Sequence, residues 1–154
     1  AGGGGAADMI GTAQGYPTML GKFPNMNGSD NVTLFRVEEM HLIAAETSLR
    51  AGNAADALTY LNNIPAIRGL GANYYASATL ENILLERRKE FAFEGLRFHD
   101  LSRMGMDMPL IDPFKQLNDD LTGTPPTYGS YRYAYPIALS ERNANPNMVQ
   151  NYGY

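Results

Sequence analysis

Cysteine is absent from this sequence of 154 residues. Its absence excludes disulfide bonds, thiol catalysis and cysteine-ligated metal sites together. Histidine is scarce, since only His41 and His99 occur, and two imidazoles far apart in sequence are too few for a histidine-rich metal cluster. The sequence therefore predicts neither a metal site nor a bound cofactor.

Long apolar runs and a strong excess of one charge are also missing. No run of about 18 consecutive apolar residues occurs, so no transmembrane helix is expected. The net charge is −4 without a visible basic stripe, which argues against nucleic acid as the main partner. Hydrophobic residues make up 44% of the chain, which is enough to form a core, so we expect a folded domain.

Two adjacent helices are predicted in the first half of the chain. Residues 36–51 carry apolar side chains at helical spacing, and Gly52 should end this helix. Asn53 should cap a second helix over 53–64, which Pro65 ends or kinks. The expected inward residues are Val37, Met40, Ile43, Ala44 and Thr47 in the first helix, and Ala54, Ala57, Leu58, Leu61 and Ile64 in the second.

Small residues are placed regularly in this hairpin. Leu61 follows Ala57 by one helical turn, and Ala45 precedes Ala57 in the other helix. This spacing resembles a tetratricopeptide repeat, in which small residues let paired helices approach closely. An ordinary helical hairpin explains the spacing as well, so both interpretations stay open. In either case we expect antiparallel helices in contact through Ala44, Ala45, Ala57 and Leu61.

A third helix is predicted from its cap at Thr79 to about residues 104–105. Its expected inward residues are Leu80, Ile83, Leu84, Phe91 and Leu96. Charged residues alternate with aromatic ones in its second half, "ERRKEFAFEGLRFHDLSRMG". Each acid there has a base within one turn, and buried charges need partners. We therefore expect a structural charge network of Arg87, Glu90, Glu94, Arg97, Asp100 and Arg103.

A glycosidase offers a different explanation of these carboxylates. Glu90, Glu94 and Asp100 could in principle include an acid/base pair flanking a sugar. Such a pair faces a cleft from separate elements, whereas these acids share one helix and each has an arginine nearby, which lowers a carboxyl pKa. We therefore expect no catalysis. The helix arginines Arg87, Arg88, Arg97 and Arg103 are expected instead to bond the backbone of residues 106–154.

The two ends of the chain differ from its middle. Residues 1–33 are rich in glycine, asparagine and serine and are predicted to be an irregular N-terminal segment, with a helical domain over 34–154. Residues 106–154 are predicted to be mostly loop packed on the helices. Within them, "NANPNMVQNYGY" should fold back onto the third helix, with Asn145, Gln150 and Asn151 bonding loop backbone. The predicted fold class is thus mainly α, with long irregular loops.

Loop tyrosines are the candidate ligand-binding residues. Flat aromatic rings cover the apolar C–H faces of sugars, and their hydroxyl groups form hydrogen bonds. The candidates are Tyr74, Tyr75, Tyr128 and Tyr131. The alternative is that these rings only hold the loops against the helices.

Three motifs resemble the SusD/RagB family. The first motif, "RVEEMHLIAAE" followed by "GNAADALTYLNNI", is similar to the repeat-like helices of the family. The charged segment at 86–105 is similar to the most recognisable helix of the family. The third motif, "YPIALSERNANPNMVQNYGY", is similar to the C-terminal ending of family members. The match covers roughly residues 16–154 and only the C-terminal part of a family member, so the resemblance implies a fragment of a larger protein. Ala138 and Tyr152 replace prolines of the family ending.

The resemblance implies a non-catalytic function. Family members are described as surface-exposed outer-membrane lipoproteins that bind glycans or other nutrients and cover a TonB-dependent, SusC-like transporter. It therefore implies an oligosaccharide ligand, that transporter as partner, and membrane association only through a lipid anchor absent from this sequence. The alternative is a tetratricopeptide-like scaffold that binds another protein.

Overall fold

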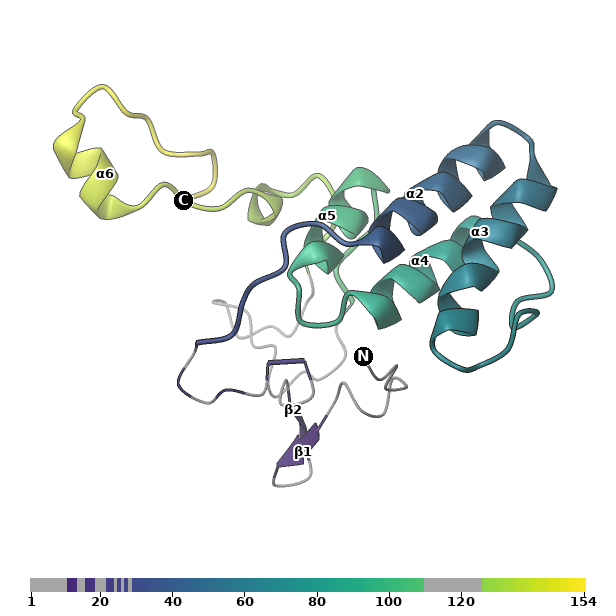
Figure 1. Ribbon diagram of the computed structural model, residues 1–154. Helices are drawn as coiled ribbons and strands as arrows, with labels where there is room; N and C mark the ends of the chain where they lie inside the picture. Colours follow the sequence, from purple (N-terminus) through teal and green to yellow (C-terminus); the bar gives the residue numbers. More distant parts are fainter. Residues whose placement is uncertain are drawn as a thin grey trace. The chain divides into compact units, whose positions relative to one another are not determined.

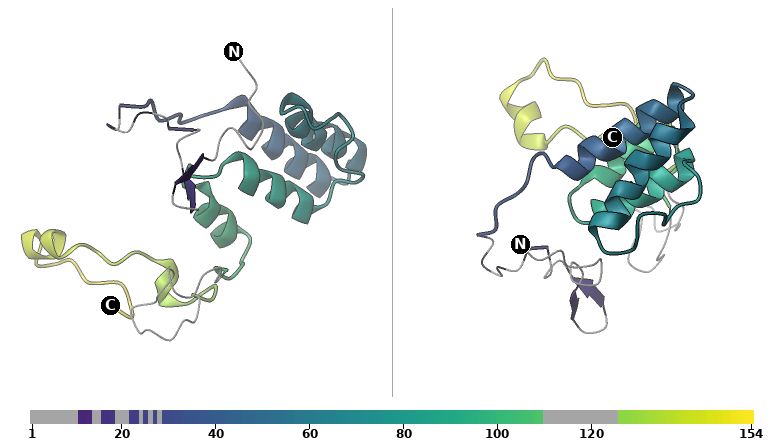
Figure 2. Two further views of the ribbon diagram at one scale, coloured as in Figure 1. Left: turned by 90° about the horizontal axis from the view of Figure 1, so that it is seen from below. Right: turned by 45° about the vertical axis from the view of Figure 1, so that its right-hand side comes forward.

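The computed structural model describes residues 11–13, 16–18, 22, 23, 25, 27, 29–109 and 126–154. The chain divides into two compact units, Ala1–Glu94 and Gly95–Tyr154. Helices build most of the described part of the first unit, and the second unit contains short helices joined by loops (Figures 1 and 2). The predicted mainly α fold class is therefore confirmed, whereas the tetratricopeptide-like detail and the boundary at residue 34 stay predictions.

Three helices build the first unit. They are α2 (Val37–Arg50), α3 (Ala54–Ile67) and α4 (Leu80–Glu90), and each contacts the other two. Figures 1 and 2 show them side by side, with α2 and α3 joined by a short turn. Part of the predicted irregular segment lies outside the described residues. Its described part includes two antiparallel strands, β1 (Gly11–Ala13) and β2 (Tyr16–Thr18), with Gly11 opposite Thr18.

Side-chain caps begin two of these helices where the sequence predicts them. The Asn53 side chain accepts a hydrogen bond from the Asp56 amide at 3.3 Å, and Thr79 accepts one from the Asn82 amide at 3.1 Å. These bonds satisfy amides of the first turn that have no partner within the helix. Gly52 adopts a φ of 81°, the left-handed conformation that allows the tight turn between α2 and α3.

The core of the first unit contains only part of the predicted inward sets of α3 and α4, because Ala54 is exposed and Leu58 and Leu80 are half-buried. Ala57, Leu61 and Ile64 are fully buried, and so are Ile83 of α4 and Leu42 of α2. Ala45 is also fully buried, which agrees with close packing of α2 on α3. Small side chains at Ala45 and Ala57 leave room for the neighbouring backbone at this contact.

The prediction of which face of α2 is buried is wrong. Val37, Met40 and Ile43 are 69%, 49% and 43% exposed, whereas Leu42, Ala45 and Glu46 are buried. Apolar residues follow helical spacing on both faces of this helix, so periodicity alone does not say which face is buried. The buried face is the one that carries the small residue Ala45 against α3.

Pro65 does not end α3, one of the two outcomes that the sequence predicts, and a kink there stays a prediction. The helix continues to Ile67, and Pro65 lies inside its last turn with its side chain fully buried. A proline this close to the C-terminus removes only one N–H from the helix. Its carbonyl accepts a hydrogen bond from the Leu70 amide at 2.9 Å, and burial of the ring adds apolar packing.

The predicted third helix is also interrupted. It ends at Glu90, and α5 (Leu96–Arg103) begins after a turn in which Phe93 and Gly95 have positive φ angles of 67° and 79°. Such angles do not fit an α-helix and favour glycine. Two cations bond the freed carbonyls. Lys22 Nζ donates to Glu90 O at 2.9 Å and to Ala92 O at 3.0 Å, and Arg36 Nη2 donates to Glu90 O at 3.0 Å.

The second unit consists of α5, a short 3-10 helix η2 (Tyr131–Tyr133) and α6 (Leu139–Ala144), joined by loops. Residues 110–125 of the predicted long loop lie outside the described residues. Ring contacts connect α5 to η2 and to the loop that follows it, since the Phe98 ring lies 5.7 Å from that of Tyr133 and 5.8 Å from that of Tyr135.

The C-terminal residues fold back on the chain, but their contacts are with residues 131–137. Gln150 accepts a hydrogen bond from the Ile137 amide at 2.8 Å and donates one to its carbonyl at 3.1 Å. Asn151 donates to Tyr135 O at 2.7 Å, and the Tyr154 hydroxyl donates to Ala134 O at 2.8 Å. The amide side chains of Gln150 and Asn151 bond loop backbone as predicted, and docking of this segment on the third helix stays a prediction.

Ala57→Leu should lower the free energy of unfolding by about 1–3 kcal/mol, because a larger side chain overpacks the contact between α2 and α3. Ala57 is fully buried, whereas Ala55 on the same helix is exposed, so Ala55→Leu is the matched control. Urea denaturation of both variants measures the effect. Equal midpoints for the two variants would count against this packing.

Candidate functional site

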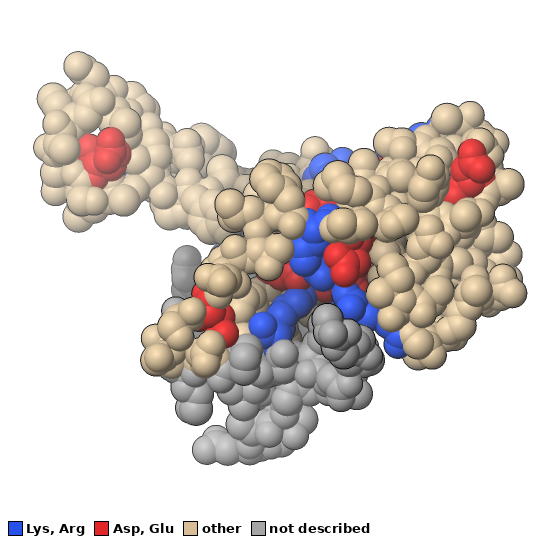
Figure 3. Space-filling model, in the orientation of Figure 1, with Lys and Arg blue, Asp and Glu red and all other residues tan. Residues whose placement is uncertain are grey.

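The densest group of charges lies around the end of α4. The Glu90 side chain is only 2% exposed and accepts hydrogen bonds from two arginines. Arg36 Nη1 donates to Oε1 at 2.7 Å, Arg68 Nη2 to the same oxygen at 2.5 Å, and Arg68 Nε to Oε2 at 3.1 Å. Figure 3 shows acidic and basic side chains gathered at the centre of this face.

Further acids and one lysine extend this group. Glu38 accepts a bond from Arg68 Nη2 at 3.1 Å, and Glu94 Oε1 lies 2.9 Å from Arg36 Nη2. Lys22 forms an ion pair with Glu94. We call these six residues the Glu90 cluster: the cations Lys22, Arg36 and Arg68, and the carboxylates Glu38, Glu90 and Glu94. The three positive and three negative charges balance.

The electrostatics of Glu90 suit an ion pair and not acid catalysis. Burial alone would raise its pKa, but hydrogen bonds and charge from Arg68 and Arg36 outweigh burial and lower the pKa below its ordinary value. The pKa of Arg68 is raised mainly by its hydrogen bond to Glu90. A glycosidase acid needs a raised carboxyl pKa, so Glu90 is a poor candidate for that role.

Arg36 and Arg68 were missed by sequence reasoning. The sequence places Arg87 one turn from Glu90, but in the structure Arg87 lies over the Phe91 ring at 5.3 Å and 4.0 Å from Glu39. The signal for Arg68 was its place at the end of the second helix, in "IPAIRGLGA". Nothing in the sequence shows that its side chain reaches the end of α4.

The remaining predicted charge pairs have mixed outcomes. Arg103 Nε donates to Asp100 Oδ1 at 2.9 Å, and Asp100 is buried, so this pair forms within α5. Glu94 and Arg97 belong to different units, and their pairing stays a prediction. The bonds expected from Arg87, Arg88, Arg97 and Arg103 to the backbone of residues 106–154 stay predictions too.

Tyr75 is held by hydrogen bonds at both its backbone and its side chain. Its hydroxyl donates to Glu86 Oε2 at 2.6 Å and accepts from Lys89 Nζ at 2.8 Å. Burial and the hydrogen bond to Glu86 raise the pKa of Tyr75 to about 12. The Asn62 side chain also bonds the amide and carbonyl of Tyr75, at 2.8 and 3.0 Å. With only 8% of Tyr75 exposed, little of its ring is available to a ligand.

Tyr74 offers more surface than its neighbour. Its ring is exposed and meets the Tyr75 ring edge-on at 4.9 Å between centroids. Lys89 Nζ lies 4.9 Å from the Tyr74 ring centroid, a cation–π distance. Tyr74 is thus an exposed aromatic ring of the first unit that contacts both Tyr75 and Lys89.

Tyr128 and Tyr131 are exposed in the second unit. The Tyr128 ring packs edge-on against Tyr133 at 5.6 Å, and the Tyr131 ring against Tyr154 at 5.2 Å. The Tyr128 amide donates to Asp107 at 2.7 Å, which fixes the loop that carries it. Tyr128, Tyr133, Phe98 and Tyr135 form a continuous series of ring contacts.

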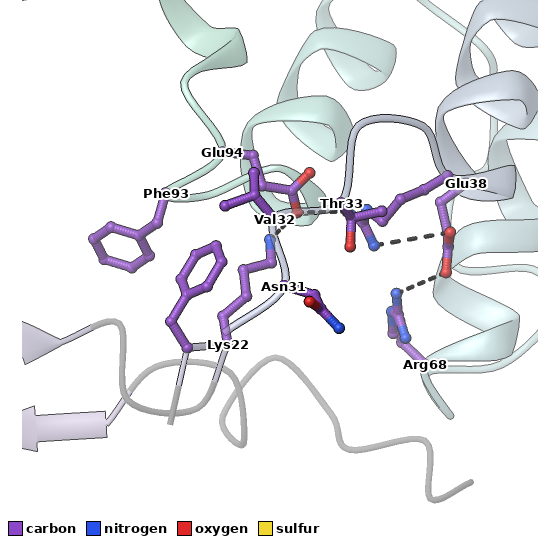
Figure 4. A pocket seen from close by; sticks show the side chains of 10 residues that line it. Lys22, Asn31, Val32, Thr33, Glu38, Arg68, Phe93 and Glu94 are labelled. Atoms are coloured by element: carbon purple, nitrogen blue, oxygen red, sulfur yellow. Dashed lines mark hydrogen bonds and ion pairs between the residues drawn. The ribbon is translucent and has the colours of Figure 1, made fainter. Parts of the chain in front are cut away.

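A pocket of about 540 Å³ lies against the Glu90 cluster in the first unit (Figure 4). Its wall combines charged, polar and apolar side chains: Lys22, Phe23, Asn31, Val32, Thr33, Arg36, Glu38, Arg68, Phe93 and Glu94. Figure 4 shows Asn31 between Lys22 and Arg68, with Phe93 at one end. The sequence analysis did not identify this pocket, because its residues come from distant segments.

Comparison with known proteins assigns the chain to a family. The family model described as "SusD family" matches residues 7–154, nearly the whole chain. The chain belongs to the SusD family. The resemblance predicted from the three motifs is therefore confirmed.

Curated relatives and solved structures agree with this SusD-family assignment. The chain is 31% identical over 142 residues to the starch-binding protein SusD of Bacteroides thetaiotaomicron, covering 92% of this chain and 24% of that protein. It is 28% identical to SusD-like protein P25 of Formosa agariphila, covering 83% and 25%. A crystal structure of a putative sugar binding protein from Bacteroides vulgatus matches with a TM-score of 0.71 and 33% identity, over 95% of this chain and 35% of that one.

The SusD-family chain thus spans about a quarter of the length of these curated relatives. Its charged motif forms the end of α4, the following turn and α5, and contributes Glu90 and Glu94 to the Glu90 cluster. Its C-terminal motif supplies Gln150 and Asn151, which bond the loop before α6. Among the described residues, no helix combines the length and the apolar character needed to cross a membrane.

Proposed function

We propose that this chain is part of a non-catalytic, surface-exposed lipoprotein of the outer membrane that binds a glycan or another nutrient. The observation that carries the proposal is membership of the SusD family over residues 7–154. One relative is named a starch-binding protein, and one similar structure is titled a putative sugar binding protein. The proposed partner is a TonB-dependent, SusC-like transporter that takes up the bound ligand.

The electrostatics of the charged motif support a non-catalytic function. Glu90 is buried and paired with Arg36 and Arg68, and its pKa is lowered. Asp100 is buried and bonded by Arg103. A carboxylate held in an ion pair is a poor proton donor to a glycosidic oxygen.

Exposed tyrosines are the proposed sugar contacts. Tyr74, Tyr128 and Tyr131 each present ring surface to solvent and each packs edge-on against a second tyrosine, which restrains its orientation. A restrained ring covers the C–H face of a sugar with little loss of conformational freedom. Tyr128 has the largest exposed fraction of the three, at 53%.

Tyr128→Ala should weaken binding of a starch oligosaccharide by about two- to tenfold, since losing one stacked ring costs about 0.5–1.5 kcal/mol. Isothermal titration of the chain with maltoheptaose measures this. Tyr152→Ala is the matched control, because Tyr152 is an exposed tyrosine of the same unit for which no ring contact is found among the described residues. Equal losses in both variants would remove Tyr128 from the proposed site.

A tetratricopeptide-like scaffold that binds another protein is the second candidate function. The exposed apolar side chains Val37, Met40 and Ile43 of α2 favour it, because exposed apolar patches mark interaction surfaces. A scaffold would lose its protein partner on Met40→Glu and would bind no oligosaccharide. A nutrient-binding protein would keep its oligosaccharide affinity in the same variant.

A further inference from the structure

We propose that the pocket beside the Glu90 cluster is a second ligand site, which takes a small, uncharged, hydroxyl-rich molecule such as one or two sugar residues. This inference rests on the proposed function and adds a site apart from the surface tyrosines. All its lining residues belong to the first unit.

The charge balance of the pocket points to an uncharged ligand. Its cations Lys22, Arg36 and Arg68 are already paired with Glu90, Glu94 and Glu38. An anionic ligand would have to compete with these carboxylates for the same cations. A cationic ligand would have to compete with Lys22, Arg36 and Arg68 for the carboxylates. A neutral ligand leaves the ion pairs intact and uses only hydrogen bonds.

Hydrogen-bonding groups remain available at the wall. Asn31 and Thr33 are exposed, and their uncharged polar side chains line the pocket. This set contains both donors and acceptors, and a hydroxyl group both donates and accepts. Several hydroxyl groups on one small molecule therefore match this wall.

Phe93 adds an aromatic ring to the pocket wall, and its own backbone conformation is strained. It has a φ of 67°, a conformation that is unfavourable for a bulky residue and that often marks a functional position. Its side chain is exposed and lines the pocket beside Phe23 and Val32. An apolar face next to polar groups suits a sugar ring, which has C–H faces and a hydroxyl edge.

The size of the pocket agrees with such a ligand. Small-molecule sites typically enclose about 300–1,000 Å³, and this pocket encloses about 540 Å³. One or two sugar rings fit this volume. The site would therefore bind a short saccharide or a short part of a longer one.

Titration of the 154-residue chain with three neutral disaccharides (maltose, cellobiose and lactose) and with digalacturonate tests the site. We expect at least one neutral disaccharide to bind, and digalacturonate to bind no more tightly. Phe93→Ala should weaken binding at least tenfold. Phe35→Ala is the matched control, because Phe35 is exposed and lies outside the pocket wall. Thr33→Val is the second pocket variant, which keeps the shape of the side chain and removes its hydroxyl.

The outcomes separate this inference from the proposed function. Loss of disaccharide binding in Phe93→Ala or Thr33→Val, with binding kept in Tyr128→Ala and Phe35→Ala, supports the pocket. Loss only in Tyr128→Ala overturns the pocket and leaves the proposed function standing. Failure of all three disaccharides to bind, or tighter binding of digalacturonate, also overturns the pocket. If Phe93→Ala does not fold, as judged by circular dichroism, Thr33→Val alone decides.

Discussion

Glu90→Gln should lower the free energy of unfolding by about 3–5 kcal/mol. Glu90 is the common partner of Arg36 and Arg68, and its side chain is only 2% exposed. The amide of glutamine keeps the shape but removes the negative charge, so two largely buried guanidinium groups lose their main counter-charge. Urea denaturation at pH 7 measures the change.

The pH dependence of the same variant gives an independent check. Because the pKa of Glu90 is lowered on folding, its stabilising contribution is fully present above the unfolded-state pKa of about 4.3. The contribution is lost as the pH falls through the lower, folded-state pKa. The stability difference between the wild type and Glu90→Gln should therefore shrink in strong acid.

Glu81→Gln is the matched control for this variant. Glu81 lies in the first turn of α4 and is exposed, so its replacement should change the stability by less than about 1 kcal/mol. If Glu90→Gln and Glu81→Gln had the same midpoint, the Glu90 cluster would not stabilise the fold.

Asn62→Ala should destabilise the chain by about 2–6 kcal/mol, from about 1–3 kcal/mol for each of two buried backbone groups left without a partner. The Asn62 side chain accepts from the Tyr75 amide at 2.8 Å and donates to the Tyr75 carbonyl at 3.0 Å. These bonds join α3 to the loop before α4.

The neighbouring asparagine provides the control for this prediction. Asn63 is half-buried, and its side chain makes a longer contact, of 3.4 Å, with His41 Nδ1. Asn63→Ala should therefore cost about 1 kcal/mol or less. Thermal unfolding followed by circular dichroism compares the two variants. A smaller effect for Asn62→Ala than for Asn63→Ala would contradict the role of the Asn62 bonds.

Local features of the fold could be predicted from the sequence because their causes are local. The caps Asn53 and Thr79 bond amides three residues ahead, and Gly52 supplies the turn of the hairpin. The small residues Ala45 and Ala57 indicated close helix packing, and both are fully buried. Family membership was predicted from the order of three motifs.

Features that depend on distant residues could not be predicted in the same way. Apolar residues lie on two faces of α2, and the face that is buried is the one that packs against α3. Arg36 and Arg68 reach Glu90 from positions 54 and 22 residues away in sequence. The carbonyls freed by the break after Glu90 are bonded by Lys22 and Arg36, which lie far away in sequence. The pocket likewise combines segments that sequence spacing does not connect.

Incubation of the chain with maltoheptaose, with binding heat and new reducing ends measured on the same sample, tests most directly the proposal that the protein binds a glycan and does not cleave it. We predict saturable binding heat and no increase in reducing ends. Release of reducing ends that disappears in Glu94→Gln would contradict the proposal, because it would make a carboxylate of the Glu90 cluster catalytic.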